Sequence, residues 1–397
     1  RVVKFRSSTG AAGSLSGAPD AAGTHNHTDA VGYTHTNIAS GVLRGTWGVE
    51  PSYGSASFGS LPSGYTVKRG DPGSSTDTSA AAAHVTREYQ ICLKCHSDYG
   101  YTDNNVYPLG SRPSLGYAGG TPAGTNNLQQ YTNQAREFQA PATHKGEVTT
   151  TDGGQAAAYQ TNNHRSWHPV MGDTGRTGTV RGNGTNISAR WRLPWSNAVG
   201  TQTMYCSDCH GTDTAATSVI PNGGENGSPW GPHGSGNNFI LKGQWNTATG
   251  SGQQATGLCF KCHDYASYAT DSGNRTGFFN PGWRGDLHSY HANKIGRMRC
   301  NWCHVAVPHG WKNKALLVNL NDVGPEAGVA PGTQVRNNTT AAYNSGPYYM
   351  NAILKIRSFA RSGNWAENNC GSAGAPGNGQ SGRNWMRDSN ENCTNPP

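Results

Sequence analysis

Apolar residues are sparse along this chain and occur in short stretches. An apolar run at residues 2–5 predicts a short strand, an apolar-periodic stretch runs over residues 84–93, and the alternation at residues 354–357 predicts a second strand. No apolar run approaches the length of about 18 residues that a transmembrane helix needs. Glycine and proline make about 19% of the residues, so loops and turns should dominate, with short helices and few short strands.

The composition predicts a small apolar core for a chain of 397 residues. Leu, Ile, Val and Phe together make about 13% of the residues, below the roughly 20% at which disorder is suspected. The formal net charge is only +8, which is too dilute over this length to hold the chain open by self-repulsion. We therefore expect another component to supply the apolar interior.

A pattern that recurs four times identifies that component. Each copy is Cys-x-x-Cys-His, the attachment signature of c-type haem, and this composition would not produce four matches by chance. Two thiols can reach the two vinyl groups on one edge of a porphyrin while the next residue turns its imidazole onto the iron. A zinc half-site or a redox disulfide is the weaker reading, because neither requires the histidine each time. The pattern predicts four haem c groups, attached through Cys92, Cys95, Cys206, Cys209, Cys259, Cys262, Cys300 and Cys303 and ligated by His96, His210, His263 and His304.

The sixth position of each iron decides whether a haem transfers electrons or binds a small molecule. The sequence has 15 histidines, so enough remain to fill all four positions. His309 follows His304 by only five residues and cannot pass around a porphyrin edge, so it should ligate a different haem. Met171 is a weaker competing ligand. The candidate distal ligands, most of them flanked by Pro or Gly or spaced along one helix face, are His168, His233, His309, His291, His288 and His84.

The motifs divide the chain into a haem-free segment at residues 1–83, a tetrahaem region at residues 84–320 and a second haem-free segment at residues 321–397. The last segment holds the two remaining cysteines, Cys370 and Cys393. A disulfide between them is the favoured use in an oxidising compartment, and free thiols are the alternative.

The first segment contains His25, His27 and His35, which we expect to be solvated loop residues, with ligation of an iron in a neighbouring molecule as the alternative. The chain begins at Arg1 without a leader pattern and is interpreted as the mature form of a secreted protein. Haem propionates would offset the basic charge, so Lys and Arg are interpreted as propionate partners and not as a nucleic-acid surface.

Several segments resemble the extracellular multihaem cytochromes that polymerise into conducting filaments, most closely the tetrahaem OmcE type. The resemblance implies bis-histidine haems in a continuous stack, little regular secondary structure, secretion to the cell exterior and a distal histidine donated between subunits. It rests on Cys206-Ser-Asp-Cys209-His210-Gly211 followed by Gly231-Pro232-His233-Gly234-Ser235, on Leu287-His288-Ser-Tyr-His291, and on Cys300-Asn-Trp-Cys303-His304-Val-Ala-Val-Pro308-His309-Gly310-Trp311.

The expected function is non-enzymatic electron transfer by a homopolymer that passes electrons to redox partner proteins or extracellular acceptors, with no nucleic acid and no membrane span. Roughly 99 residues per haem exceed what covering the cofactors requires, and a sheath with subunit contacts would use the excess. A non-polymeric periplasmic or surface tetrahaem carrier is the first alternative. A multihaem reductase with one open iron is the second, and the surplus of histidines argues against it.

Overall fold

Short elements joined by irregular chain make up the described part of the protein. This computed structural model describes residues 34–39, 43–54, 61–101, 133–136, 138, 168–174, 190–214, 217, 219, 231–245, 255–270, 272, 276, 278–280, 285–295, 299–304, 309, 314–317, 358–359 and 363–364. The expected strands at residues 2–5 and 354–357, His25, His27, Cys370 and Cys393 lie outside these residues. No helix within the described ranges is long and apolar enough to cross a membrane.

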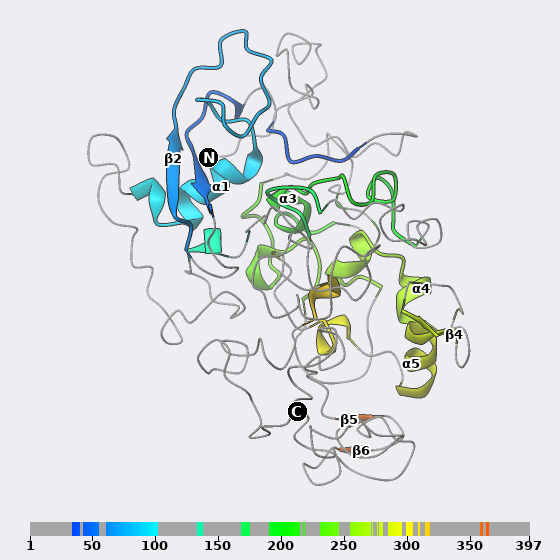
Figure 1. Ribbon diagram of the computed structural model, residues 1–397. Helices are drawn as coiled ribbons and strands as arrows, with labels where there is room; N and C mark the ends of the chain where they lie inside the picture. Colours follow the sequence, from blue (N-terminus) through cyan, green and yellow to red (C-terminus); the bar gives the residue numbers. More distant parts are fainter. Residues whose placement is uncertain are drawn as a thin grey trace, which may run out of the picture.

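The longest helices have nine residues each. The helices are α1 (Glu88–His96), α3 (Cys206–Cys209), α4 (Tyr265–Ala269) and α5 (Leu287–Ile295) (Figure 1). The strands form three antiparallel pairs: β1 (Gly48–Ser52) with β2 (Gly64–Lys68), β3 (Phe279–Asn280) with β4 (Gly285–Asp286), and β5 (Ser358–Phe359) with β6 (Gly363–Asn364).

Helix α1 begins at Glu88 because the side chain of Gln90 satisfies the backbone at its start. Gln90 Oε1 accepts hydrogen bonds from the backbone N–H groups of Thr86 (2.9 Å) and Arg87 (3.1 Å), which would otherwise lack partners. The acidic Glu88 lies in the first turn and the basic Lys94 in the last turn, the arrangement that the helix dipole favours. The apolar-periodic stretch at residues 84–93 is therefore helical only in its second half.

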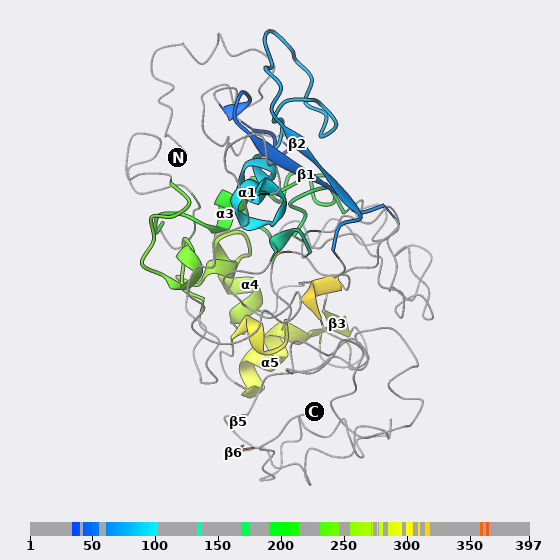
Figure 2. The same cartoon turned by 90° about the vertical axis from the view of Figure 1, so that its left-hand side faces the viewer.

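The β1–β2 hairpin packs directly on α1 (Figure 2). A Cβ atom at Gly48 would lie 2.8 Å from Val85 Cγ2 and 3.0 Å from the backbone carbon of Gln90, so only glycine allows β1 to approach this closely. In the register, Val49 pairs with Val67. The hairpin lies within the segment at residues 1–83, but it contacts the helix that carries Cys92. These contacts therefore cross the boundary that we expected at residue 84.

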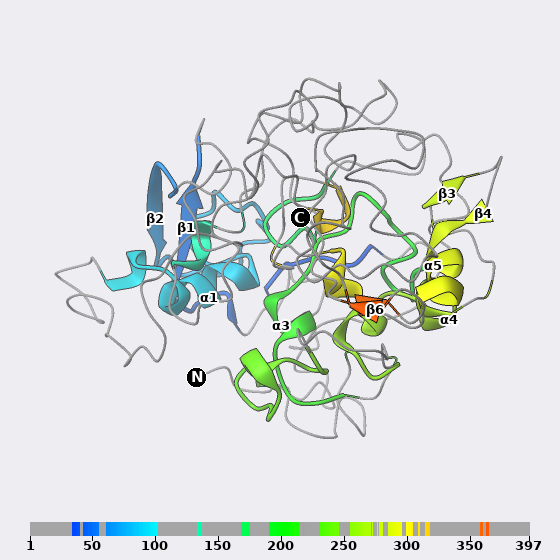
Figure 3. The ribbon, with the colours of Figure 1, turned by 90° about the horizontal axis from the view of Figure 1, so that it is seen from below.

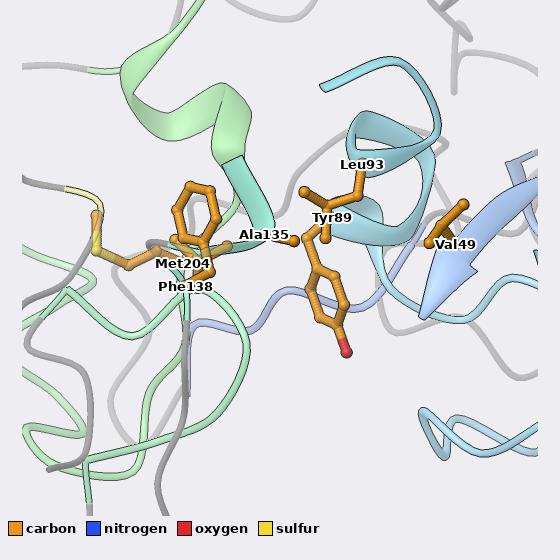
Figure 4. Close-up of a cluster of buried hydrophobic side chains, with 7 residues drawn as sticks. Val49, Tyr89, Leu93, Ala135, Phe138 and Met204 are labelled. Atoms are coloured by element: carbon orange, nitrogen blue, oxygen red, sulfur yellow. The ribbon is translucent and has the colours of Figure 1, made fainter. Parts of the chain in front are cut away.

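A small hydrophobic core lies between α1 and the chain that leads into α3. Figure 4 shows Val49 on one side of α1 and Ala135, Phe138 and Met204 on the other. Met171, Cys206 and Cys209 are partly buried against this cluster. The core therefore ends at the thiols of the second cysteine motif. It is made up of Val49, Tyr89, Leu93, Ala135, Phe138, Val170 and Met204.

Residues 34–39 connect α1 to the segment before α3. Ala39 N donates to Thr86 O (2.8 Å), and Thr203 N donates to His35 O (3.0 Å). The expectation that His35 is a solvated loop residue is wrong: its side chain is fully buried, and its Nε2 lies 2.8 Å from Asp208 Oδ2. Its ring packs edge-on against Trp195 and Tyr205, which replaces the water that the expectation assumed.

The elements that carry the cysteine motifs and their neighbours lie in chain order across the molecule. From top to bottom, Figure 2 shows α1, α3, α4 and α5, and in Figure 3 α1 and α3 lie to the left of α4 and α5. Helix α1 contacts α3, and α4 packs against α5. The motifs on α1 and α3 are thereby neighbours.

Candidate cofactor site

Each Cys-x-x-Cys-His segment forms about one helical turn. In the second, third and fourth copies the backbone N–H of the histidine donates to the carbonyl of the first cysteine, over 3.0, 3.0 and 2.9 Å. Residues at positions i, i+3 and i+4 of a helical turn share one face, so both thiols and the imidazole can approach one bound group. We name the segments site I (residues 92–96), site II (residues 206–210), site III (residues 259–263) and site IV (residues 300–304).

Three of the four motif histidines face a second histidine from a distant part of the chain. A bond between a metal and an imidazole nitrogen measures about 2 Å, so two rings on opposite sides of one metal have centroids about 6 Å apart. The observed separations agree with this geometry in each case. The centroids are 6.1 Å apart for His96 and His233, 6.0 Å for His210 and His309, and 6.2 Å for His304 and His288.

The histidine of site III has His168 as its neighbour. Burial lowers the pKa of His263 to about 3, and His168 is the first of the charged groups that lower it further. The backbone of His168 has φ = 70°, a conformation that costs a non-glycine residue energy and that concentrates at functional sites. Trp191 and Tyr268 flank the His263 ring edge-on, with centroids at 5.3 and 5.2 Å.

Backbone carbonyls orient two of the motif histidines. His210 Nδ1 donates to Phe239 O over 2.8 Å, and His304 Nδ1 donates to Ala315 O over 2.5 Å. Phe239 and Ala315 both have positive φ, of 58° and 56°, although neither is glycine. With Nδ1 engaged, Nε2 is the nitrogen left to bind a metal, which is how such outer partners fix the tautomer of a ligand.

A side-chain relay orients the partner histidine of site IV in the same way. The hydroxyl of Thr276 donates to Asp286 Oδ2 over 2.7 Å, so its oxygen accepts the hydrogen bond from His288 Nδ1 over 2.6 Å. Asp286 Oδ1 also accepts from Ser289 N over 3.0 Å and so fixes the start of α5. This relay leaves Nε2 of His288 for the side that faces His304.

Burial keeps these imidazoles in the neutral form, which is the form that binds metals. It lowers the pKa of His210 to about 4 and that of His288 to about 3, and nearby histidines lower both further. Burial also lowers the pKa of His304, although its hydrogen bond to Ala315 opposes the shift.

The surroundings of the cysteines favour the protonated thiol over the reactive thiolate. Burial raises the pKa of Cys209 and of Cys303 to about 12, so both remain protonated at neutral pH. All eight cysteines in the described residues are free thiols, which excludes a disulfide within any of these four motifs. The only cluster of three potential metal ligands in the described ranges joins Cys92 and Cys206 with Glu88, so no single motif converges on a zinc ion.

Neighbouring sites lie close enough to influence one another's protonation. His96 and His233 of site I lower the pKa of His210 in site II. Cys259 of site III raises the pKa of Cys209 in site II. The pKa of the site III histidine is in turn lowered by His304 and His288 of site IV. The sites therefore adjoin one another in the order I, II, III, IV.

The remaining candidate ligands have other neighbours. His84 Nε2 lies 3.0 Å from Arg44 Nη2, away from the four histidine pairs. His291 lies one turn beyond His288 on α5, with its ring beside Phe278 at 5.6 Å. Met171 Sδ accepts a hydrogen bond from Tyr53 over 3.2 Å.

Sequence reasoning did not identify Phe239, Ala315 or Thr276. A carbonyl acceptor can come from any residue type, so no sequence signal marks the first two. Comparisons with known protein families, with curated proteins and with solved structures each find no match for this chain.

Proposed function

We propose that the protein is an electron carrier that holds one c-type haem at each of the four sites. The observation that carries this proposal is the set of histidine pairs: three motif histidines face a second imidazole at 6.0–6.2 Å, and His168 neighbours the fourth. No common local sequence pattern produces this spacing, because the second histidines come from four unrelated segments. A metal between two imidazoles accounts for all of them.

The residues present fit a haem at each site. The two thiols of each motif would hold the haem covalently, and the two imidazoles would ligate its iron. Bound haem would supply reversible one-electron chemistry, and an iron ligated by two imidazoles would leave no place for a substrate. The proposal is therefore a carrier and not an enzyme. It also accounts for the small apolar core, since the cofactors would complete the interior.

The contacts between sites support a path for electrons along the order I, II, III, IV. Site I is the accessible end, because Cys95, His96 and His233 are exposed. At site III the rings of Trp191 and Tyr268 pack edge-on against His263, and Phe260 is fully buried. Electrons would enter or leave at an exposed end and cross a shielded interior.

We further propose secretion and assembly into a homopolymeric filament, on the basis of the sequence resemblance and of the large amount of chain per haem. Within the described residues each motif histidine already has a neighbouring histidine from its own chain. The filament proposed here therefore does not need a histidine donated by another subunit. Surface contacts between copies would suffice to join the exposed site I of one subunit to its neighbour.

Two measurements test these proposals separately. A pyridine haemochrome assay against protein concentration should give four haems c per chain, and fewer would reject the four-site assignment. Negative-stain microscopy of the purified holoprotein should show filaments. Dispersed particles at every concentration would reject the polymer and leave the soluble tetrahaem carrier.

A further inference from the structure

Glu88 places a buried carboxylate between the attachment sulfurs of sites I and II. It lies in the first turn of α1, four residues before Cys92, so the two side chains share one face of the helix. Only 7% of Glu88 is exposed. Its carboxylate oxygen, Cys92 Sγ and Cys206 Sγ all lie within 4.8 Å of one another.

Hydrogen bonds from site II hold this carboxylate in place. Glu88 Oε1 accepts from the backbone N–H of Ser207 over 3.0 Å, and Oε2 accepts from its hydroxyl over 2.7 Å. Ser207 is one of the two residues between the cysteines of site II. Burial lowers the pKa of Lys242, and the charges of Asp208 and Glu88 oppose this shift, as ionised carboxylates do.

The sulfurs of the cluster lose their ability to ionise when they become thioethers. The Glu88 carboxylate is then the only charged group of the three, and it lies beside the attachment edges of two haems in a poorly solvated space. A negative charge stabilises the oxidised, more positive state of a nearby iron. The equivalent cysteines of sites III and IV, Cys259 and Cys300, adjoin each other without a carboxylate completing such a cluster in the described residues.

We propose that Glu88 is a positioning and tuning residue shared by sites I and II, which lowers the reduction potentials of the two haems that it adjoins. This inference rests on the haem assignment made above.

The test is a spectroelectrochemical titration of the holoprotein and of Glu88→Gln, which keeps the side-chain shape and an acceptor for Ser207 but removes the charge. We expect two of the four midpoint potentials to rise, each by about a tenfold change in the reduction equilibrium constant, or about 59 mV for one electron. The variant His233→Met identifies one of the two, because a thioether ligand raises the potential of site I. The matched control is Glu50→Gln, which neutralises a half-buried carboxylate that binds Tyr89 and Gln90 and lies outside the cluster.

Unchanged midpoints in Glu88→Gln, an equal rise of all four, or the same rise in Glu50→Gln would overturn the proposal. Glu88→Asp provides a second variant should the first fail to accumulate. It keeps the charge but moves it away by one methylene, so the same two midpoint potentials should rise by a smaller amount. A shift of the other two midpoint potentials would contradict the proposal. If both variants still contain four haems with low-spin iron, the haem assignment holds, and any failure to shift the midpoint potentials concerns the role of Glu88 alone.

Discussion

The imidazole rings of His288 and His304 are stacked with their centroids 6.2 Å apart and their planes inclined by 29°. His291, three residues further along α5, lies beside Phe278 instead. Both His288 and His291 are candidate ligands by sequence. The structure favours His288 because Thr276 and Asp286 fix its ring from behind.

Replacing His288 by Ala should open one of the four irons. We expect a high-spin fraction of about one quarter in the ferric spectrum and carbon monoxide binding to one haem per reduced chain, because the sixth ligand is lost. The matched control, His291→Ala, should keep all four irons low-spin. If His291→Ala opened an iron and His288→Ala did not, the ligand of site IV would be His291 and our assignment of His288 would be wrong.

A second prediction concerns the carbonyl that orients His304. Proline at position 315 cannot adopt the observed φ of 56°, so Ala315→Pro should withdraw the carbonyl from His304 Nδ1. The lost hydrogen bond makes the imidazole a weaker donor, and we expect one midpoint potential to rise and the unfolding free energy to fall by at least about 1 kcal/mol.

Ala315→Gly is the control for this change, because glycine adopts positive φ without strain. Its four midpoints should match those of the wild type in the same redox titration. A shift as large in the glycine variant as in the proline variant would show that the carbonyl geometry is not the cause.

A third prediction tests the small core beside site I. Leu93 is 1% exposed within the cluster of Figure 4, so Leu93→Ala should lower the unfolding free energy by about 2–5 kcal/mol. Leu61 is 52% exposed and provides the comparison, since Leu61→Ala should change it by less than about 0.5 kcal/mol. Urea denaturation of the holoproteins measures both, and equal effects would mean that the core does not support site I.

A fourth prediction follows from the half-buried carboxyl of Glu50. Burial raises its pKa, although hydrogen bonds from Gln90 and Tyr89 oppose the shift. The folded protein therefore takes up this proton at a higher pH than the unfolded chain does. The resulting stabilisation is fully present below the ordinary carboxyl pKa and is lost as the pH rises through the raised value.

The urea midpoint of the wild type should thus fall relative to that of Glu50→Gln as the pH rises through this window, because glutamine stays neutral throughout. Tyr89→Phe removes one of the opposing hydrogen bonds and should move the window to higher pH. A difference between wild type and Glu50→Gln that stays constant over this pH range would contradict the assignment.

The local pattern of the four motifs could be read from the sequence more easily than their surroundings. Each motif groups two cysteines with a histidine, and in sites II, III and IV a backbone hydrogen bond closes this group into one helical turn. Pro and Gly beside His168, His233 and His309 made these residues candidate ligands, and the structure places each of them near a motif histidine. Which histidine faces which motif depends on contacts between segments far apart in the chain. His309 is such a case. Its short spacing from His304 excludes ligation of the same iron, but the sequence does not indicate that His309 lies beside His210.

The fold around site I was harder to predict for the same reason. Glu88 and Ser207 are separated by more than a hundred residues, and nothing local distinguishes this glutamate from a solvated one in a first helical turn. His35 is a further example, because its burial depends on Asp208 in another segment. Positive φ at Phe239 and Ala315 also has no sequence signal, since glycine is the residue that usually adopts it.

The central claim, that two imidazoles ligate each of four irons, is tested most directly by low-temperature electron paramagnetic resonance of the ferric holoprotein with quantification of the spins. We predict low-spin signals of bis-imidazole type that account for four irons per chain, with no high-spin component. A high-spin signal in the unmodified protein, or fewer than four low-spin irons per chain, would contradict it.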